Sequence, residues 1–300
     1  MAINLATLQR AAMNAVPALQ KRTLFMASAI STDFSDEIRS PLESVEANVI
    51  GSPTPATFLG AKFSDDLSGD VSAVKIQLNE KPVHKTFKLT RAQSLSAREG
   101  GDVLDKLLAA NAGACVEKML TDVLSLGTKD ALGAPIMVVK EDAVTYKGMT
   151  QLRTKLTDAG FQTSGRKVVF NSAAHDCLLA DDKVTNLRND ALATAAVTQA
   201  VLPRIAGMDV LEAPDFPAVD NAIGFAMLPQ AVAVVSRAFE PVAGNDTWTV
   251  MTEPTSGLSL VVKTWSDPDK EEELVSVSLL YGVKLLQPGA MKRICSVADS

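Results

Sequence analysis

The carboxy-terminal run 274–294 constrains the fold more than any other part of the chain. Aliphatic and β-branched residues dominate it on both sides of Tyr281-Gly282, which is the composition of two consecutive strands. Pro288-Gly289 ends the second strand, because a proline cannot donate a ladder hydrogen bond. A glycine inside a strand usually marks a bulge or the close approach of another backbone. We therefore expect a closing pair of strands with such a feature at Gly282.

The composition indicates a globular protein with a sizeable core. The chain has 300 residues, 47% of them hydrophobic, which suits one large domain or two modest ones. A net charge of −6 argues against nucleic-acid binding, which needs clustered Lys and Arg to displace counterions from phosphates. The amino terminus lacks the basic region of a signal peptide, and the most apolar stretch, 222–235, is too short to span a bilayer. We therefore expect neither export nor a membrane partner.

Residues that commonly carry catalysis are scarce. The two histidines, His84 and His175, lie far apart in the sequence. His175 and Cys177 are two positions apart, a spacing that does not bring side chains together on a helix. No motif of a zinc protease, serine hydrolase, dinucleotide site or phosphate loop occurs. The sequence therefore predicts a protein that is not an enzyme and has no catalytic, cofactor-binding or metal-binding residues.

The cysteines and the paired carboxylates are interpreted as structural. Cys115, Cys177 and Cys295 are odd in number and widely spaced, so we expect buried reduced thiols and no disulfide or metal framework. Pairs such as Asp65-Asp66 offer the oxygen ligands that hard cations prefer, but solvated loops are the better interpretation.

The first part of the chain predicts an amphipathic terminus and an extended hairpin. Residues 1–43 begin with apolar residues at helical spacing, whose face either packs on its own domain or forms an arm across a neighbouring subunit. Residues 44–95 contain turn signals followed by two alternating strands, Val74–Leu78 and Phe87–Thr90. We expect these strands to pair as a hairpin that leans on another surface, because an isolated hairpin is marginal in water.

The rest of the chain predicts a long helix, an α/β region and closing hairpins. Residues 96–143 contain a helix from Asp102 to Leu126, and residues 144–246 alternate helices with strands. Residues 247–300 alternate strands with turns. The apolar stripe of the long helix consists of Val103, Leu107, Ala114, Met119, Val123 and Leu126. The expected α/β elements are a helix at Met149–Leu156, a strand at Lys167–Asn171, a helix from Ser172, a helix at Leu187–Val201, and strands at Ile205–Leu211 and Ala231–Val235.

The order of these segments resembles the HK97-like major capsid proteins of tailed bacteriophages. The closing run 280–288 is similar to the last strands of such proteins, and the passage from the hairpin into the long helix looks closest to the P22 coat-like branch. Further segments that carry the likeness are Phe87–Thr90 leading into Ser94–Leu126, Arg166–Ser172, Ile205–Val210 and Ala222–Val235.

The resemblance implies an α+β, HK97-like capsid fold and assigns a part of it to each segment. It implies an N-terminal arm in residues 1–43 and an extended E-loop hairpin in residues 44–95. A P-domain spine helix with the segment after it would occupy residues 96–143, and an A-domain residues 144–246. The closing strands of the P-domain and the carboxy terminus would then occupy residues 247–300.

The resemblance also implies a structural function in the virion. Many copies would form pentamers and hexamers that close into an icosahedral shell around double-stranded phage DNA, enclosed without sequence-specific binding. Assembly is expected in the host cytoplasm. Because the chain lacks a long charged amino-terminal extension, the resemblance implies a separate scaffolding protein or none, and we expect a separate one. The other expected partners are a portal and, optionally, a decoration protein. No lysine, asparagine and glutamate set for covalent crosslinks can be identified, so non-covalent assembly is expected.

The candidate intersubunit contacts are apolar and basic residues of the expected arm and hairpin. They are Leu5, Leu8, Phe58, Lys62, Phe63, Lys75, Lys85 and Phe87. Two alternatives stay open. The first is the shell of an encapsulin-like nanocompartment with the same fold, which a cargo-peptide pocket would favour. The second is a soluble α/β enzyme, which turnover on a panel of substrates would reveal.

Overall fold

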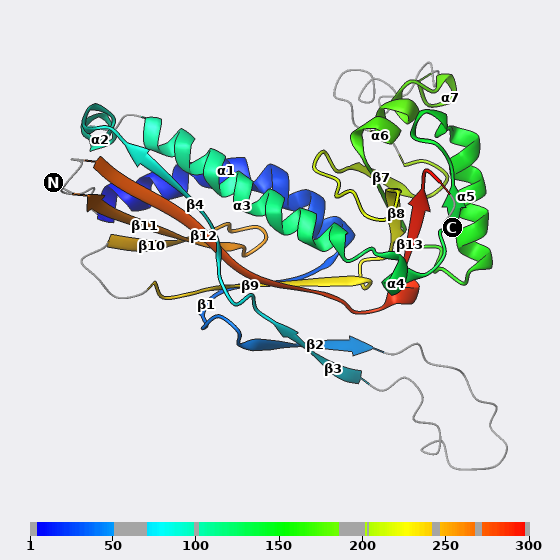
Figure 1. Ribbon diagram of the computed structural model, residues 1–300, viewed down its shortest axis with the longest axis horizontal. Coiled ribbons are helices and arrows are strands. Elements are labelled where there is room, and N and C mark those ends of the chain that lie inside the picture. The colour runs from blue at the N-terminus through cyan, green and yellow to red at the C-terminus, as the bar shows by residue number, and fades with distance from the viewer. Residues whose placement is uncertain are drawn as a thin grey trace, which may run out of the picture.

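The computed structural model of the chain describes an elongated body, a second lobe at one end of it and a two-stranded ribbon that projects from the body (Figure 1). None of the described helices is long and apolar enough to cross a membrane. The described residues are 5–50, 71–98, 102–185, 202, 204–241, 247–267 and 272–297.

A six-stranded sheet forms the body, and its longest strand organises the others. The first half of β12 pairs antiparallel with β11 on one side and with β4 on the other, and its second half pairs antiparallel with β9. β10 pairs antiparallel with β11, and β1 pairs parallel with β9. The strands are β1 (Ser31–Ile38), β4 (Val83–Leu89), β9 (Val232–Ala238), β10 (Thr247–Thr252), β11 (Ser259–Asp267) and β12 (Glu272–Leu285).

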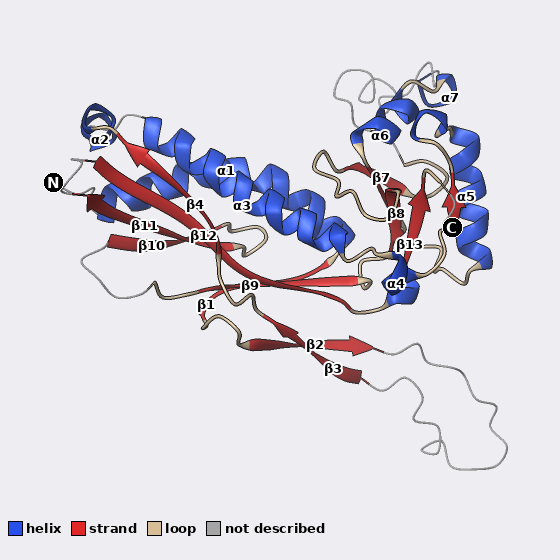
Figure 2. Cartoon of the chain, in the orientation of Figure 1, coloured by secondary structure: helices blue, strands red, loops and turns tan. Residues whose placement is uncertain are grey.

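Two long helices cover one face of this sheet (Figures 1 and 2). α1 (Leu5–Ala29) packs along α3 (Val103–Ser125) and against β10, while α3 packs against β12. Alternate residues of β12 from Val275 to Tyr281 are fully buried in the core beneath the helices. The short helix α2 (Arg91–Arg98) leads from β4 into α3.

The second lobe is a five-stranded sheet with helices around it, and it meets the body at the end of α3. Its strand order is β5-β13-β8-β6-β7, and every residue of β8 is buried. Gly127, just after α3, lies against the ring of Phe225 so closely that a methyl group there would be 2.3 Å from a ring carbon. The strands are β5 (Met137–Val138), β6 (Lys167–Phe170), β7 (Asp209–Glu212), β8 (Ala222–Met227) and β13 (Met291–Cys295). The helices are α4 (Lys129–Leu132), α5 (Tyr146–Asp158), α6 (Ser172–Leu179) and α7 (Asp182–Thr185), with 3₁₀ turns at Glu141–Ala143 and Pro288–Ala290.

The projecting ribbon consists of β2 (Ser44–Ile50) and β3 (Val71–Gln77), which pair antiparallel. The predicted hairpin between Val74–Leu78 and Phe87–Thr90 is therefore wrong, because β4 pairs with β12 instead. Strands β3 and β4 contribute residues to different apolar cores. Leu89 is fully buried in the main core beneath the helices, whereas Ile76 and Leu78 are buried in a separate cluster on the sheet. Pairing them as a local hairpin would leave both clusters incomplete.

The long helix was predicted at the right place, but its buried face differs from the predicted stripe. Met119 and Val123 are buried as expected, whereas Ala114 is exposed. Val103, Leu107 and Leu126 are only half-buried. The buried face instead contains Leu104, Leu108, Ala112, Cys115, Val116 and Leu124. The helix has apolar residues on several sides, and contacts with α1 and β12 select among them, which periodicity alone does not resolve.

Three further predictions differ from the structure or lie outside it. The two closing strands expected around Tyr281-Gly282 are one uninterrupted strand, β12. The strand expected at Ile205–Leu211 begins only at Asp209, because Ala206 and Gly207 adopt positive φ values of 50° and 80° in a tight turn. The helix expected at Leu187–Val201 lies outside the described residues.

Candidate assembly surface

The base of the ribbon is anchored on the sheet face opposite the two long helices. Ile76 and Leu78, at the end of β3 and just after it, are buried against Ala233 and Val235 of β9 and Leu280 of β12. Successive strand residues point to opposite faces, so these residues face away from the helix-covered core. The ribbon therefore shares a small apolar core of its own with the body.

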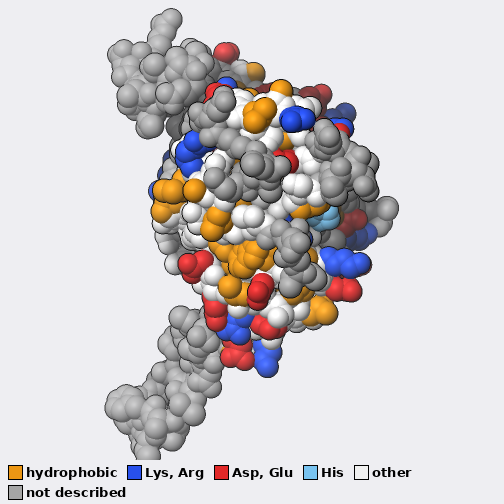
Figure 3. Space-filling view, turned by 90° about the vertical axis from the view of Figure 1, so that its left-hand side faces the viewer, with side chains coloured by type: hydrophobic (Ala, Val, Ile, Leu, Met, Phe, Trp, Pro, Cys, Tyr) orange, Lys and Arg blue, Asp and Glu red, His pale blue; other side chains and the backbone are white. Residues whose placement is uncertain are grey.

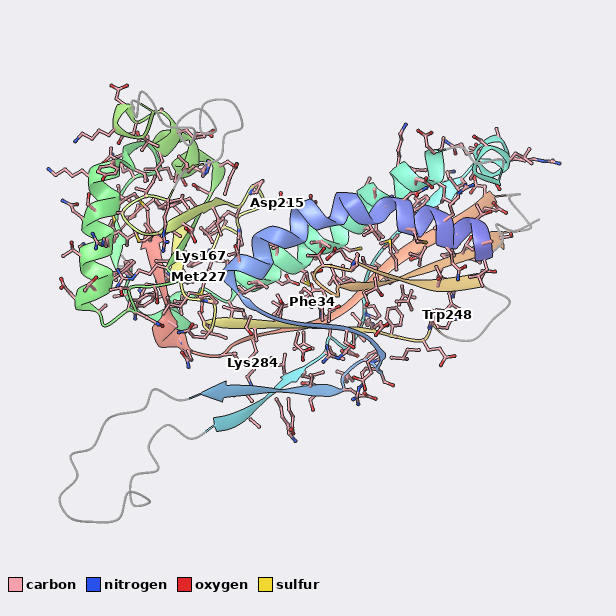
Figure 4. The ribbon with its side chains drawn as sticks, turned by 180° about the vertical axis from the view of Figure 1, so that it is seen from behind. Phe34, Lys167, Asp215, Met227, Trp248 and Lys284 are labelled. Atoms are coloured by element: carbon pink, nitrogen blue, oxygen red, sulfur yellow. The ribbon has the colours of Figure 1, made fainter. Side chains whose placement is uncertain are left out.

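The backbones of the ribbon and the body also approach each other directly. A methyl group at Gly282 would lie 2.3 Å from the carbonyl oxygen of Gln77, far inside normal contact distance. The amide of Asn79 donates to the Tyr281 carbonyl at 2.9 Å, on one side of this crossing. On the other side, the Lys284 ammonium donates to the Lys75 carbonyl at 2.9 Å, and Figure 4 shows Lys284 on the ribbon side of the sheet. Of the two features that Gly282 was expected to mark, a bulge or the close approach of another backbone, the structure shows the close approach.

A charged cluster ties the strand that precedes the ribbon to the body. The Arg237 guanidinium of β9 is only 6% exposed and donates to the carbonyl and the carboxylate of Asp33 at 2.8 and 2.9 Å. The Glu37 carboxylate lies 3.7 Å from Nε of Arg237 and 2.6 Å from Nη2 of Arg39. These contacts fix the parallel pairing of β1 with β9 immediately before the chain enters the ribbon.

The predicted contact residues differ in exposure. Leu5, Lys75 and Lys85 are exposed and can reach a second molecule. Leu8 is fully buried in its own subunit and offers no surface, and Phe87 is half-buried against the same core. The remaining candidates, Phe58, Lys62 and Phe63, lie outside the described residues.

Several exposed apolar residues were missed by the sequence analysis. Met13 on α1 is 74% exposed and lines a groove between α1 and β10, together with Val16 and Thr249–Thr252. β10 pairs only with β11 in the described sheet, so its outer edge borders this groove. Figure 3 views the end of the body where α1 and α2 start, and hydrophobic side chains gather on it. No sequence signal separates such residues from core residues, because both fit the same helical spacing.

The polar side chains of the second lobe cap helices and pair with one another. Asp181 accepts hydrogen bonds from the amides of Tyr146 and Lys183 at 2.8 and 2.9 Å, and these bonds lower the pKa of its carboxyl group. Ser172 donates to Glu212 at 2.6 Å, and the buried His175 lies 4.0 Å from the same carboxylate. Among the described residues, no group of three or more potential ligands is placed to hold a metal ion.

The three cysteines are free thiols in this structure. Cys115 and Cys295 are buried, and Cys177 is half-buried. Burial raises the pKa of the Cys115 thiol to about 11, so it remains protonated and unreactive at neutral pH.

His175 gives the second lobe a pH-dependent stability. Burial lowers the pKa of its imidazole, and the nearby Glu212 and Asp176 oppose that shift. The unfolded chain therefore takes up the proton at higher pH than the folded chain. The contribution of neutral His175 is complete above about pH 6.5 and is lost as the pH falls below that value. We expect His175→Gln to have a lower Tm than the wild type at pH 8. At pH 5 the difference in Tm between the two proteins should be smaller. Parallel Tm curves for the two proteins would contradict this role.

No protein-family model matches the sequence, and no curated protein matches it. Solved structures do match the fold. A structure of Mycobacterium phage Che8 is similar at TM-score 0.51 and 19% identity, over 84% of each chain. The capsid structure of the cyanophage P-SCSP1u is similar at TM-score 0.54 and 12% identity, over 90% of this chain and 87% of that one. The holo-SrpI encapsulin complex of Synechococcus elongatus PCC 7942 is similar at TM-score 0.52 and 12% identity, over 90% and 85% of the chains.

The chain has the HK97-like capsid fold. The match extends over most of both chains, so it includes the body, the second lobe and their connection. At such low identity, the HK97-like fold is shared as an arrangement of helices and strands while most side chains differ. Assignment to the P22-like branch remains a prediction.

Proposed function

We propose that the chain is the major capsid protein of a tailed bacteriophage, and that its copies form the pentamers and hexamers of an icosahedral shell. Similarity over nearly the whole chain to phage capsids, among them those of the cyanophage P-SCSP1u and Ralstonia phage GP4, carries the proposal. Repeated heterologous contacts between copies generate rings, and rings joined with curvature close into a shell.

The architecture supports a role for each part in that shell. We assign the ribbon β2–β3 to the E-loop, α3 to the spine helix, the body sheet to the P-domain and the second lobe to the A-domain. The amino-terminal segment would serve as the arm, although Leu8 and Ala12 already pack in their own subunit. Among the predicted contact residues, the exposed ones that can contact a neighbouring subunit are Leu5, Lys75 and Lys85.

The proposed shell encloses double-stranded DNA without binding it tightly or sequence-specifically. A net charge of −6 supports this role, because a surface that bound phosphates tightly would need an excess of Lys and Arg. The partners that we propose for this shell are a separate scaffolding protein, a portal and a decoration protein bound to the outer surface. We place assembly in the host cytoplasm and the finished shell in the virion.

One alternative has an observation in its favour. The similarity to the SrpI encapsulin complex is as extensive as that to the phage capsids, so a protein nanocompartment would use the same fold. An encapsulin-like shell would close without scaffold and retain a co-expressed cargo protein, whereas a phage capsid would package DNA with its portal. The matched structures include phage capsids and an encapsulin complex, and no observation favours the enzyme alternative.

Light scattering and negative-stain microscopy of the purified chain test the proposal. We expect rings, sheets or closed particles, formed by the chain alone or on addition of a scaffolding protein. The wild type should show a steep rise in scattering with concentration, because each subunit must engage several neighbours. A compact monomer at every concentration, with scaffold present, would contradict the proposed function.

A further inference from the structure

The ribbon crosses the body with its backbone in direct contact with that of β12. β3 passes over β12 where Gln77 meets Gly282, and the Gln77 carbonyl carbon would lie 3.0 Å from a methyl group at position 282. Gly282 has no left-handed φ, so the requirement for glycine here is one of space. Any side chain at this position would push the two backbones apart.

The contacts around the crossing hold the ribbon at one angle. The amide of Leu78 donates to the Glu43 carbonyl at 2.8 Å, which closes the base of the ribbon, and the amide of Asn79 donates to Tyr281. Ile76 lies over Gly282 itself, with a side-chain carbon 3.3 Å from the position of a methyl group there. The apolar cluster and these hydrogen bonds all belong to one subunit, so the ribbon direction is set before any neighbour binds.

We propose that Gly282 is a positioning residue that sets the angle of the ribbon on the body and, through it, the curvature of the shell. The second half of this proposal rests on the proposed function. A strand rises about 3.3 Å per residue, so the seven residues of β3 make a lever of roughly 20 Å. A tilt of about 10° at the crossing would therefore move the far end of β3 by roughly 3.5 Å. Such a shift changes where the ribbon meets the next copy.

Gly282→Ala and Gly289→Ala form a matched pair for the test. A methyl group at Gly289 meets no atom within 4 Å, so this variant controls for the loss of a glycine. Hydrogen exchange on dissociated subunits should show the amides of Leu78 and Asn79 exchanging at least tenfold faster in Gly282→Ala, with α3 unchanged. Electron microscopy should show particles of altered diameter or open sheets. Gly289→Ala should match the wild type in both measurements.

Unchanged exchange at Leu78 and Asn79 in Gly282→Ala would overturn the anchoring role. Faster exchange with particles of normal diameter would overturn the link to curvature. If wild type and Gly289→Ala form no particles under any condition, the proposed function fails and the link to curvature falls with it, while the exchange data still decide the anchor. Should Gly282→Ala not fold, Leu78→Ala trims the same cluster without a backbone clash and should accelerate exchange at the same amides.

Discussion

Replacing Met119 with aspartate is expected to lower the free energy of unfolding by about 4 to 5 kcal/mol, which is a large fraction of the roughly 5 to 15 kcal/mol that stabilises a typical domain. Met119 is fully buried on the face of α3 that packs in the main core. A carboxylate there would lose its hydration without gaining a partner charge. Urea unfolding of dissociated subunits, followed by circular dichroism, measures the change.

Leu107→Asp is the matched control on the same helix. Leu107 is only half-buried, so its aspartate can remain hydrated, and we expect a loss of about 1 to 2 kcal/mol. Equal losses in the two variants would show that the buried face of α3 is not the one described. Wild-type stability of Met119→Asp would contradict the packing of α3 on the sheet.

Replacing Arg293 with methionine is expected to destabilise the second lobe by about 3 kcal/mol. The Arg293 side chain is fully buried in β13 and donates to the carbonyls of Gly133 and Asp220 at 3.1 and 2.6 Å. These carbonyls belong to the end of α4 and to a turn in which Asp220 and Asn221 both have positive φ. Methionine fills similar space but leaves both acceptors without this donor.

Lys292→Met is the control for Arg293→Met, because Lys292 is the neighbouring residue of the same strand and is only half-buried. We expect Lys292→Met to stay within about 0.5 kcal/mol of the wild type. Hydrogen exchange should place the effect of Arg293→Met in α4, β8 and β13, with α3 protected as before. A uniform loss of protection over the whole chain, or none, would contradict a local role for Arg293.

The sequence predicted elements whose signals are local. The helix at Val103–Ser125, the strand at Lys167–Phe170 and the helix from Ser172 were predicted from the local pattern of apolar residues. The structure adds that Asn171 caps the last of these helices, because its side chain accepts a hydrogen bond from the Ala174 amide. The requirement for glycine at position 282 was also readable, because a glycine inside an apolar strand usually marks a bulge or the close approach of another backbone.

Partners between distant strands could not be read from local signals. Lys85 and Val277 are paired across the chain, and nothing near either residue specifies the other. An alternating segment such as β4 fits a local hairpin and a long-range sheet equally well, and only the competition between two apolar cores decides between them. Intersubunit contact residues were harder to predict than strand partners. Leu5 and Leu8 share one helical pattern, but only Leu8 is buried.

A cryo-electron microscopy reconstruction of particles assembled from the purified chain would show whether the ribbon joins one subunit to the next. We expect a closed shell of pentamers and hexamers in which each ribbon β2–β3 contacts an adjacent subunit, while Ile76 and Leu78 remain packed on β9 and β12 of their own subunit. A particle whose ribbons touch no neighbour would contradict the proposed function of the ribbon, and a chain that stays monomeric in the presence of a scaffolding protein would contradict shell formation.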